Sequence, residues 1–269
     1  MINKAICHAV MLKQHSFDTL NFVKGTKNNN LEIFLLIMLD RLHNSSKSLE
    51  LLLNQYSKHP THEFAIGIIL RSALLDTIIS INLFNILEEN KEHPEKELKN
   101  MLEEAAEKYL GDGFDKIINN LERDLNNGFF AAEELSDTYN NLVRQYPTFF
   151  KEYNYDGSKP TVKHKNIQQK KLYETIANSA TLKNLSDIVN KYEFFSKYDH
   201  FTLIHYQMIR QSKEDREKRI VESFEHLIFH SILLHNLIKE VYPEDFFVKQ
   251  HSLIGKYCEE KIINERIKS

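Results

Sequence analysis

The chain has 269 residues, of which 42% are hydrophobic and 27% charged, and it carries a formal net charge of -3. This composition belongs to a globular protein with enough chain for a large core. It indicates neither a broad basic surface for nucleic acid nor a protein that reads DNA sequence. Only 7 Gly and 5 Pro occur, which favours long helices over many short strands. Cys7 and Cys258 form neither a metal-type spacing nor a disulfide framework, so we expect a cytoplasmic protein.

The first part of the chain predicts two helices ahead of the most apolar stretch. Residues 16–24 are expected to form a short leading helix, and the polar run at 26–30 is a loop that can cap the second helix. Residues 31–56 predict this second helix, which is apolar at first and amphipathic later. Thr61 is a good N-cap for the next helix, and the short connection predicts antiparallel neighbours.

The apolar stretch from Phe64 to Leu87 is the centre of the predicted fold. Its apolar side chains fall all the way round a helix, so this helix is either wrapped by others or crosses a membrane. Arg71 and Asp76 lie inside it, and placing either at mid-membrane costs about 2.5–3.5 kcal/mol. Because the flanking residues are also polar, we expect a buried central helix over about residues 61–89 and no membrane span.

The middle of the chain is more polar than either flank. Its charged, helical pattern over about residues 91–165 predicts a polar excursion within a single helical domain that covers residues 1–269. No flexible linker marks it as a separate domain. The expected helices cover residues 94–110, 112–126 and 129–146, and residues 153–165 form the clearest loop.

That loop and the residues after it are locally basic. The basic side chains are Lys159, Lys163, His164, Lys165, Lys170 and Lys171. One interpretation is a solvated loop that runs into a helix, and the other is a patch that contacts phosphate groups. Beyond it, helical patterns cover residues 167–177, 182–198, 200–210, 213–241 and 244–267. The expected fold class is therefore all-α, a long-helix bundle around the buried central helix.

Tyr192, Ser196 and His200 occur at four-residue steps and so share one helical face. Buried hydroxyl and imidazole groups need hydrogen-bond partners, and Arg71 and Asp76 of the central helix can supply them. A cluster of these five residues is either a satisfied buried network that fixes helix register or a ligand or catalytic pocket. In the second case His200 would act as the acid or base.

The sequence RSALLD in a long apolar helix, with Tyr-x-x-x-Ser-x-x-x-His later in the chain, resembles a group of bacterial all-helical proteins. In that group an Arg-Ser-x-x-x-Glu helix precedes a Tyr…Ser…His helix. Some members are linked to abortive infection and phage defence, and they are similar to the HEPN superfamily of helical bundles. The resemblance covers roughly residues 31–240, and Asp76 stands where Glu is expected.

The resemblance also implies a candidate catalytic pair. HEPN ribonucleases carry an Arg, then 4–6 residues and a His, and Arg219 with His226 in RIVESFEH is the match here. In such enzymes these groups activate a 2′-hydroxyl and stabilise the phosphate without a metal ion. The alternative interpretation is that Arg219 is a surface residue on a solvated helical turn.

Glu222, His226 and His230 lie at successive four-residue steps and so share one helical face. His pairs at this spacing can bind zinc or iron, which makes these residues an alternative metal site. A di-iron bundle needs Glu-x-x-His on two helices, and that pattern is absent from the sequence. No Gly-rich phosphate loop is present either, so we expect no cofactor.

We therefore expect a cytosolic bacterial helical-bundle protein with a role in stress or phage defence. It would bind a protein partner, a second copy of itself or RNA. One alternative is a metal-independent HEPN-type ribonuclease that uses Arg219 and His226. Another is a small-ligand or metal-binding protein with its pocket around Arg71.

Overall fold

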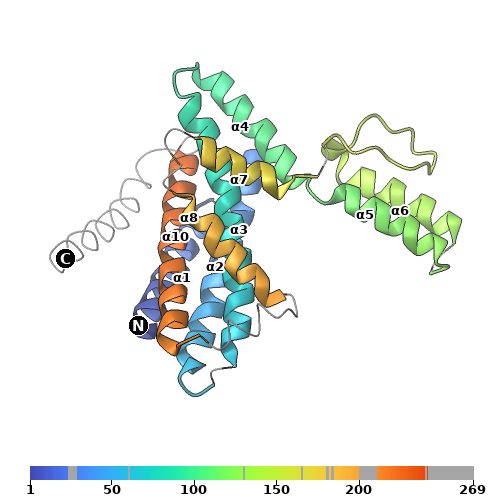
Figure 1. The fold of residues 1–269 in the computed structure, drawn as a ribbon. Helices are drawn as coiled ribbons and strands as arrows, with labels where there is room; N and C mark the ends of the chain where they lie inside the picture. Colours follow the sequence, from blue (N-terminus) through green and yellow to red (C-terminus); the bar gives the residue numbers. More distant parts are fainter. Residues whose placement is uncertain are drawn as a thin grey trace.

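The computed structural model describes residues 1–23, 29–59, 61–129, 131–164, 166–179, 182, 185–199, 211–239 and 241. Its regular elements over these ranges are helices, and the predicted all-α class is confirmed (Figure 1). The helices of the bundle are α1 (Ile2–Val23), α2 (Asn30–Tyr56), α3 (His62–Glu89), α4 (Glu95–Leu110), α7 (Gln169–Asn178), α8 (Asp187–Ser196), the 3-10 turn η3 (Lys197–Asp199) and α10 (Lys213–Lys239). The expected helices at 200–210 and 244–267 lie outside the described residues.

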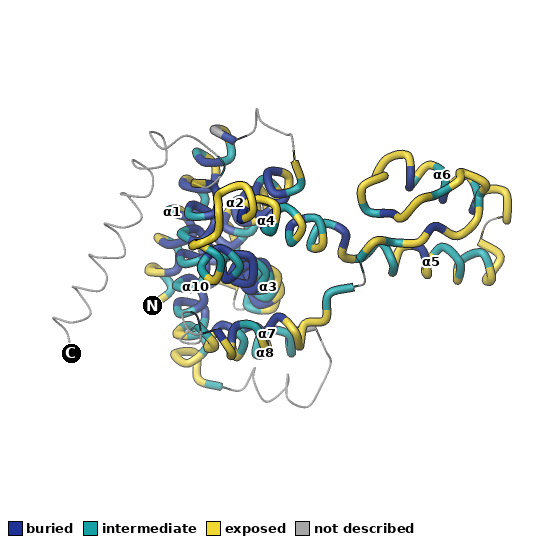
Figure 2. Tube along the Cα trace, turned by 90° about the horizontal axis from the view of Figure 1, so that it is seen from above, coloured by how far each residue is buried: buried dark blue, intermediate teal, exposed yellow. Residues whose placement is uncertain are grey.

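Helix α3 is the central helix that the apolar stretch predicts. It packs against α2, α10, α8, α4 and α7, and its Leu70, Leu74 and Ile78 are fully buried. Figure 2 shows the buried residues of the bundle concentrated where these helices face one another. By length and composition α3 is the one helix of the described ranges apolar enough to cross a membrane, but 56% of its most apolar window is buried. A core helix that is wrapped by neighbours meets the same test.

Helix α1 begins at Ile2, so the prediction of a short helix at 16–24 was too short. The buried face of its first half is made of Ala5, Ala9 and Leu12, which step by three and four residues. Small alanine side chains contribute little hydrophobic signal, although they allow α1 to pack closely on α2 and α10. The helical pattern was therefore present in the sequence but weak.

Two side chains, one just before α2 and one on α4, fix the start of α2 by hydrogen bonds. The Asn29 side chain accepts a hydrogen bond from the Glu32 backbone N–H at 2.8 Å, as the predicted capping loop requires. The carboxylate of Glu103 on α4 accepts from the N–H groups of Asn30 at 2.6 Å and Leu31 at 2.8 Å. Glu103 thus caps α2 and joins α4 to it. Thr61 precedes α3 as expected, but its side chain makes no cap hydrogen bond.

Residues 111–164 form an arm that projects from the bundle (Figures 1 and 2). The arm contains α5 (Phe114–Asn126), α6 (Ala132–Gln145), the 3-10 turn η1 (Pro147–Phe149) and a return segment bridged at Phe150 and Val162. It has its own small core of Ile118, Leu135, Tyr139, Val143 and Phe150. Helix α4, which belongs to the predicted polar excursion, packs on the bundle through Leu98 and Leu102, and the arm begins after it.

The two chain segments at the arm base are joined by hydrogen bonds. Asp112 accepts from the Ile167 N–H at 2.8 Å, and Asn166 contacts the Gly113 N–H and Asp115, each at 3.4 Å. Gly113 has a φ of +99°, in the left-handed region that glycine adopts without strain, so the chain can turn from α4 into α5 here. These contacts hold the outgoing and returning segments side by side.

Candidate functional site

Asp76 is bound by Arg41 of α2, a residue outside the predicted five-residue cluster. Arg41 Nε donates to Asp76 Oδ2 at 2.8 Å and Nη2 donates to Oδ1 at 2.9 Å, a bidentate pair. Burial raises the pKa of the Asp76 carboxyl above its ordinary value, against the opposing effect of Arg41. Residues five apart differ by about 140° around a helix. Asp76 therefore faces α2, and Arg71 points in another direction.

Arg71 and Tyr192 are brought together as predicted. The guanidinium carbon of Arg71 lies 5.8 Å from the centre of the Tyr192 ring, within cation–π range. The Tyr192 hydroxyl accepts a hydrogen bond from Gln169 Nε2 at 2.9 Å, which ties α8 to α7. The Ser196 hydroxyl donates to the Glu193 carbonyl of its own helix at 2.7 Å. His200, the proposed acid or base, lies outside the described residues.

Arg219 and His226 both lie against α8, which runs antiparallel to α10. The Arg219 guanidinium carbon is 4.2 Å from the centre of the Phe194 ring, and His226 Nε2 is 3.5 Å from Asp187 Oδ2. Between them Lys191 pairs with Glu222. We call these three contacts the α8–α10 ladder.

The α8–α10 ladder separates the two members of the candidate catalytic pair. Seven residues correspond to about 10.5 Å along a helix axis, and the Lys191–Glu222 ion pair occupies the space between Arg219 and His226. Burial lowers the pKa of His226 below its ordinary value, with Asp187 opposing this effect. This lowering favours the neutral imidazole. Both residues therefore contact α8 of the same chain.

The metal alternative at Glu222, His226 and His230 is not formed. Glu222 is engaged by Lys191 and Lys218, while His230 is 1% exposed with its Nε2 at 2.9 Å from the Ser80 hydroxyl. Within the described ranges no group of three His, Cys, Asp or Glu side chains is placed to hold a metal ion. Burial lowers the pKa of His230 to about 3, so its imidazole is neutral in the core.

A partly buried cluster surrounds Glu63, which no pattern in the sequence singled out. The Glu63 carboxylate accepts from the Tyr56 hydroxyl at 3.2 Å and the Tyr198 hydroxyl at 3.0 Å, and Arg216 Nε lies 2.9 Å from it. Burial and the nearby Glu63 charge raise the pKa of Tyr56 to about 12. The cluster joins α2, α3, η3 and α10. Its only sequence signal was an acidic residue in the first turn of α3, which is also a common feature of exposed helix starts.

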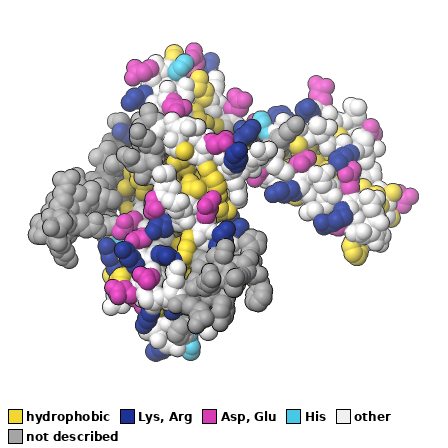
Figure 3. Space-filling view, in the orientation of Figure 1, with side chains coloured by type: hydrophobic (Ala, Val, Ile, Leu, Met, Phe, Trp, Pro, Cys, Tyr) yellow, Lys and Arg dark blue, Asp and Glu magenta, His cyan; other side chains and the backbone are white. Residues whose placement is uncertain are grey.

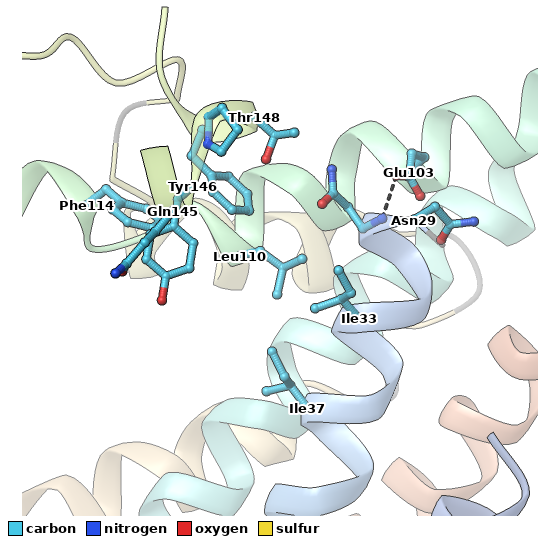
Figure 4. Close-up of a pocket in the computed structure, with 12 residues that line it drawn as sticks. Asn29, Ile33, Ile37, Glu103, Leu110, Phe114, Gln145, Tyr146 and Thr148 are labelled. Carbon is cyan, nitrogen blue, oxygen red and sulfur yellow. Dashed lines mark hydrogen bonds between the residues drawn. The ribbon is translucent and has the colours of Figure 1, made fainter. Parts of the chain in front are cut away.

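A cleft of about 670 Å³ lies on one side of the arm base (Figure 4). Ile33 and Ile37 of α2, which are 37% and 42% exposed, face it from the bundle. Leu110 at the end of α4 and Tyr146 of the arm line it from the other side. The lining is mainly apolar and contains no cluster of charged groups suited to chemistry.

A second hollow, of about 440 Å³, lies between α4, α7 and the returning segment, and we call it the neck pocket. Its basic lining residues come from three segments and are Lys108, Lys163, His164 and Lys171. The lining also includes the amide side chains of Asn82, Asn166 and Gln168 and the hydroxyl groups of Tyr109 and Thr175. Figure 3 shows Lys and Arg side chains at this junction of arm and bundle. The neck pocket therefore combines positive charge with hydrogen-bond donors, which is the chemistry that recognises anions.

Only part of the basic run seen in the sequence reaches this pocket. Lys163 and His164 line it and contact the Glu107 carboxylate at 3.3 Å and 3.1 Å. Lys159 instead pairs with Glu122 on the arm, and Lys170 pairs with Glu174 on the outer side of α7. Lys165 lies outside the described residues.

The fold and these contacts define an all-α helical-bundle protein with a projecting arm and a basic pocket at its base. Comparisons with models of known protein families, with curated proteins and with solved structures found no match to this chain. A functional proposal therefore has to come from the residues of the chain itself.

Proposed function

We propose that this protein is a cytosolic bacterial helical-bundle protein of the HEPN-like, abortive-infection type, which binds RNA without cutting it in a stress or phage-defence setting. The observation that supports RNA binding is the neck pocket, where Lys108, Lys163, His164 and Lys171 converge from three segments. Cationic side chains that contact phosphates supply most of the affinity of non-specific RNA binding. The chain as a whole has a net charge of -3, so this positive charge is local.

The α8–α10 ladder supports binding over cleavage. In HEPN-type chemistry Arg and His act together on one phosphate. Here Arg219 covers the Phe194 ring and His226 contacts Asp187, with an ion pair between them. Each side chain already has a packing role within the chain. The ribonuclease remains the alternative that an activity test has to separate from binding.

A combined binding and cleavage experiment tests the proposal. Fluorescence anisotropy with labelled single-stranded RNA at low salt should show binding that weakens as salt rises, because counterions compete for the phosphates. Gel analysis of single-stranded and transfer RNAs incubated with the protein in EDTA should show no cleavage. The His226→Ala variant should bind RNA as the wild type does.

Two variants with the same charge change make the binding test specific. Lys163→Gln removes a cation of the neck pocket, whereas Lys170→Gln removes one that pairs with Glu174 outside it. We expect the first variant to weaken RNA binding and the second to leave it nearly unchanged. RNA cleavage that His226→Ala abolishes would replace this proposal with the ribonuclease, and an absence of salt-sensitive RNA binding would refute it.

A further inference from the structure

We infer that the neck pocket is a phosphomonoester site, which takes the terminal phosphate of a nucleotide, either free or at the end of an RNA chain. The inference rests on the proposed function, because it names the part of an RNA that the pocket would hold. A free mononucleotide carries the same chemical group, so the two sources share one recognition chemistry. The support comes from charge, shape and the first turn of α7.

The charges around the pocket match a terminal phosphate better than an internal one. Lys163 and His164 both contact the Glu107 carboxylate, which offsets the charge of Lys163. Lys108 and Lys171 line the pocket and make no ion pair with any residue of the described ranges. A terminal phosphate carries a charge of about -1.5 to -2 at pH 7, whereas a phosphodiester carries a single charge. Two uncompensated lysines therefore suit the monoester.

The volume of the pocket also favours a chain end or a single nucleotide. A hollow of about 440 Å³ falls within the range of small-molecule sites, roughly 300–1,000 Å³. Its lining includes the polar Asn82 of α3, which is 5% exposed and donates to the Leu172 carbonyl at 3.3 Å. Asn82 thereby joins α3 to α7 at the pocket.

The first turn of α7 adds to the attraction for an anion. Gln168 and Lys171 from this turn line the pocket. The helix has no acidic residue in its first turn, and Gln168 makes no side-chain cap hydrogen bond. The positive end of the helix dipole is therefore not offset by a carboxylate from its own turn. This effect supplements the lysines and would not define a site without them.

Calorimetry with three probes tests the inference at low ionic strength. The probes are inorganic phosphate, adenosine 5′-monophosphate and adenosine. We expect the first two to bind and adenosine to show no binding, because the phosphate is the recognised group. Equal binding of adenosine and its monophosphate would overturn the inference, and so would an absence of binding by both phosphate probes.

Matched variants locate the bound phosphate. Lys108→Gln combined with Lys171→Gln should lower the affinity for adenosine 5′-monophosphate at least tenfold. Lys170→Gln, which removes one positive charge at the position next to Lys171 on α7, should change it less than twofold. Lys108 and Lys171 are both exposed, so the melting temperature of the double variant should match that of the wild type. Equal losses of affinity in the double variant and in Lys170→Gln would mean that any positive charge in this region attracts the phosphate. That result would overturn the proposed site.

RNA probes separate this inference from the proposed function. Three RNAs of one sequence should be compared, with a 5′-phosphate, a 3′-phosphate or no terminal phosphate. The inference expects tighter binding of a phosphorylated end, lost in the double lysine variant. Equal affinity for all three would overturn the terminal-phosphate assignment and leave RNA binding standing. Pocket-dependent binding of the mononucleotide without RNA binding would support the site and refute the proposed function.

Discussion

Replacing Arg41 by Met tests how much the Arg41–Asp76 pair contributes to stability. The substitution keeps an apolar chain of similar length and leaves Asp76, which is 5% exposed, without its bidentate partner. Breaking a fully buried ion pair costs about 3–5 kcal/mol. The Arg41 side chain is 47% exposed, and solvent screening lowers such values. We therefore expect a loss of about 2–3 kcal/mol at pH 7.5, measured by urea unfolding monitored by circular dichroism.

The pH dependence of this loss provides the internal control. Burial already raises the pKa of Asp76 in the folded protein, and removing Arg41 raises it further. An acidic group whose pKa is higher in the folded than in the unfolded protein stabilises the fold by keeping its proton. This stabilisation is complete at pH values below the unfolded pKa and is lost as the pH rises through the folded pKa. Arg41→Met should therefore be less destabilising at pH 4.5 than at pH 7.5, and adding Asp76→Asn should restore stability. Equal losses at both pH values, or no recovery in the double variant, would refute the buried-pair interpretation.

Three further predictions address the core. His230 has a pKa lowered to about 3 by burial, so the unfolded chain binds a proton that the folded chain does not. Stability should fall by up to about 1.4 kcal/mol per pH unit as pH drops from about 6.5 toward 3. His230→Gln should flatten that slope in urea titrations at several pH values, and an unchanged slope would contradict it. Gly67→Ala should destabilise by about 1–3 kcal/mol, because the new Cβ would lie 2.9 Å from the Tyr198 ring. A melting temperature equal to that of the wild type would show that the ring moves freely. Tyr56→Phe should lower the free energy of unfolding by about 1 kcal/mol, because it removes a hydrogen bond to Glu63. An unchanged melting temperature would show that this hydrogen bond does not stabilise the fold.

The fold class could be predicted from hydrophobic periodicity because long helices repeat the same signal over many turns. The apolar pattern of α3 and the amphipathic pattern of α2 gave their limits to within a residue or two. The early start of α1 was missed because Ala5 and Ala9 face the core with small side chains. The predicted polar excursion includes α4 because α4 is as polar in sequence as α5 and α6, although Leu98 and Leu102 fix it to the bundle.

Side-chain pairing was predicted less well, since it depends on rotation about a helix axis and on neighbours distant in sequence. Arg71 is close to Asp76 along the chain, yet the two point in different directions, and Arg41 from the preceding helix reaches the carboxylate. Arg71 does lie beside Tyr192, where the need of a buried Tyr192 hydroxyl for a polar neighbour had placed it. Nothing in a single sequence indicates that Arg219 would cover Phe194.

The neck pocket is a second case in which residues distant in sequence decide the outcome. Lys163 and Lys171 stood out as a basic run, but a run of like charges cannot by itself distinguish a solvated loop from a site. Lys108 on α4 and Asn82 on α3 make that distinction, because they line the same pocket as Lys163 and Lys171. They lie near these lysines because the two segments of the arm base are joined. The hydrogen bond from Ile167 to Asp112 and the contacts of Asn166 bring the returning segment back beside α4. The bonds that position the arm are therefore also the bonds that assemble the pocket, and a substitution such as Asp112→Ala should weaken phosphate binding although residue 112 does not line the pocket.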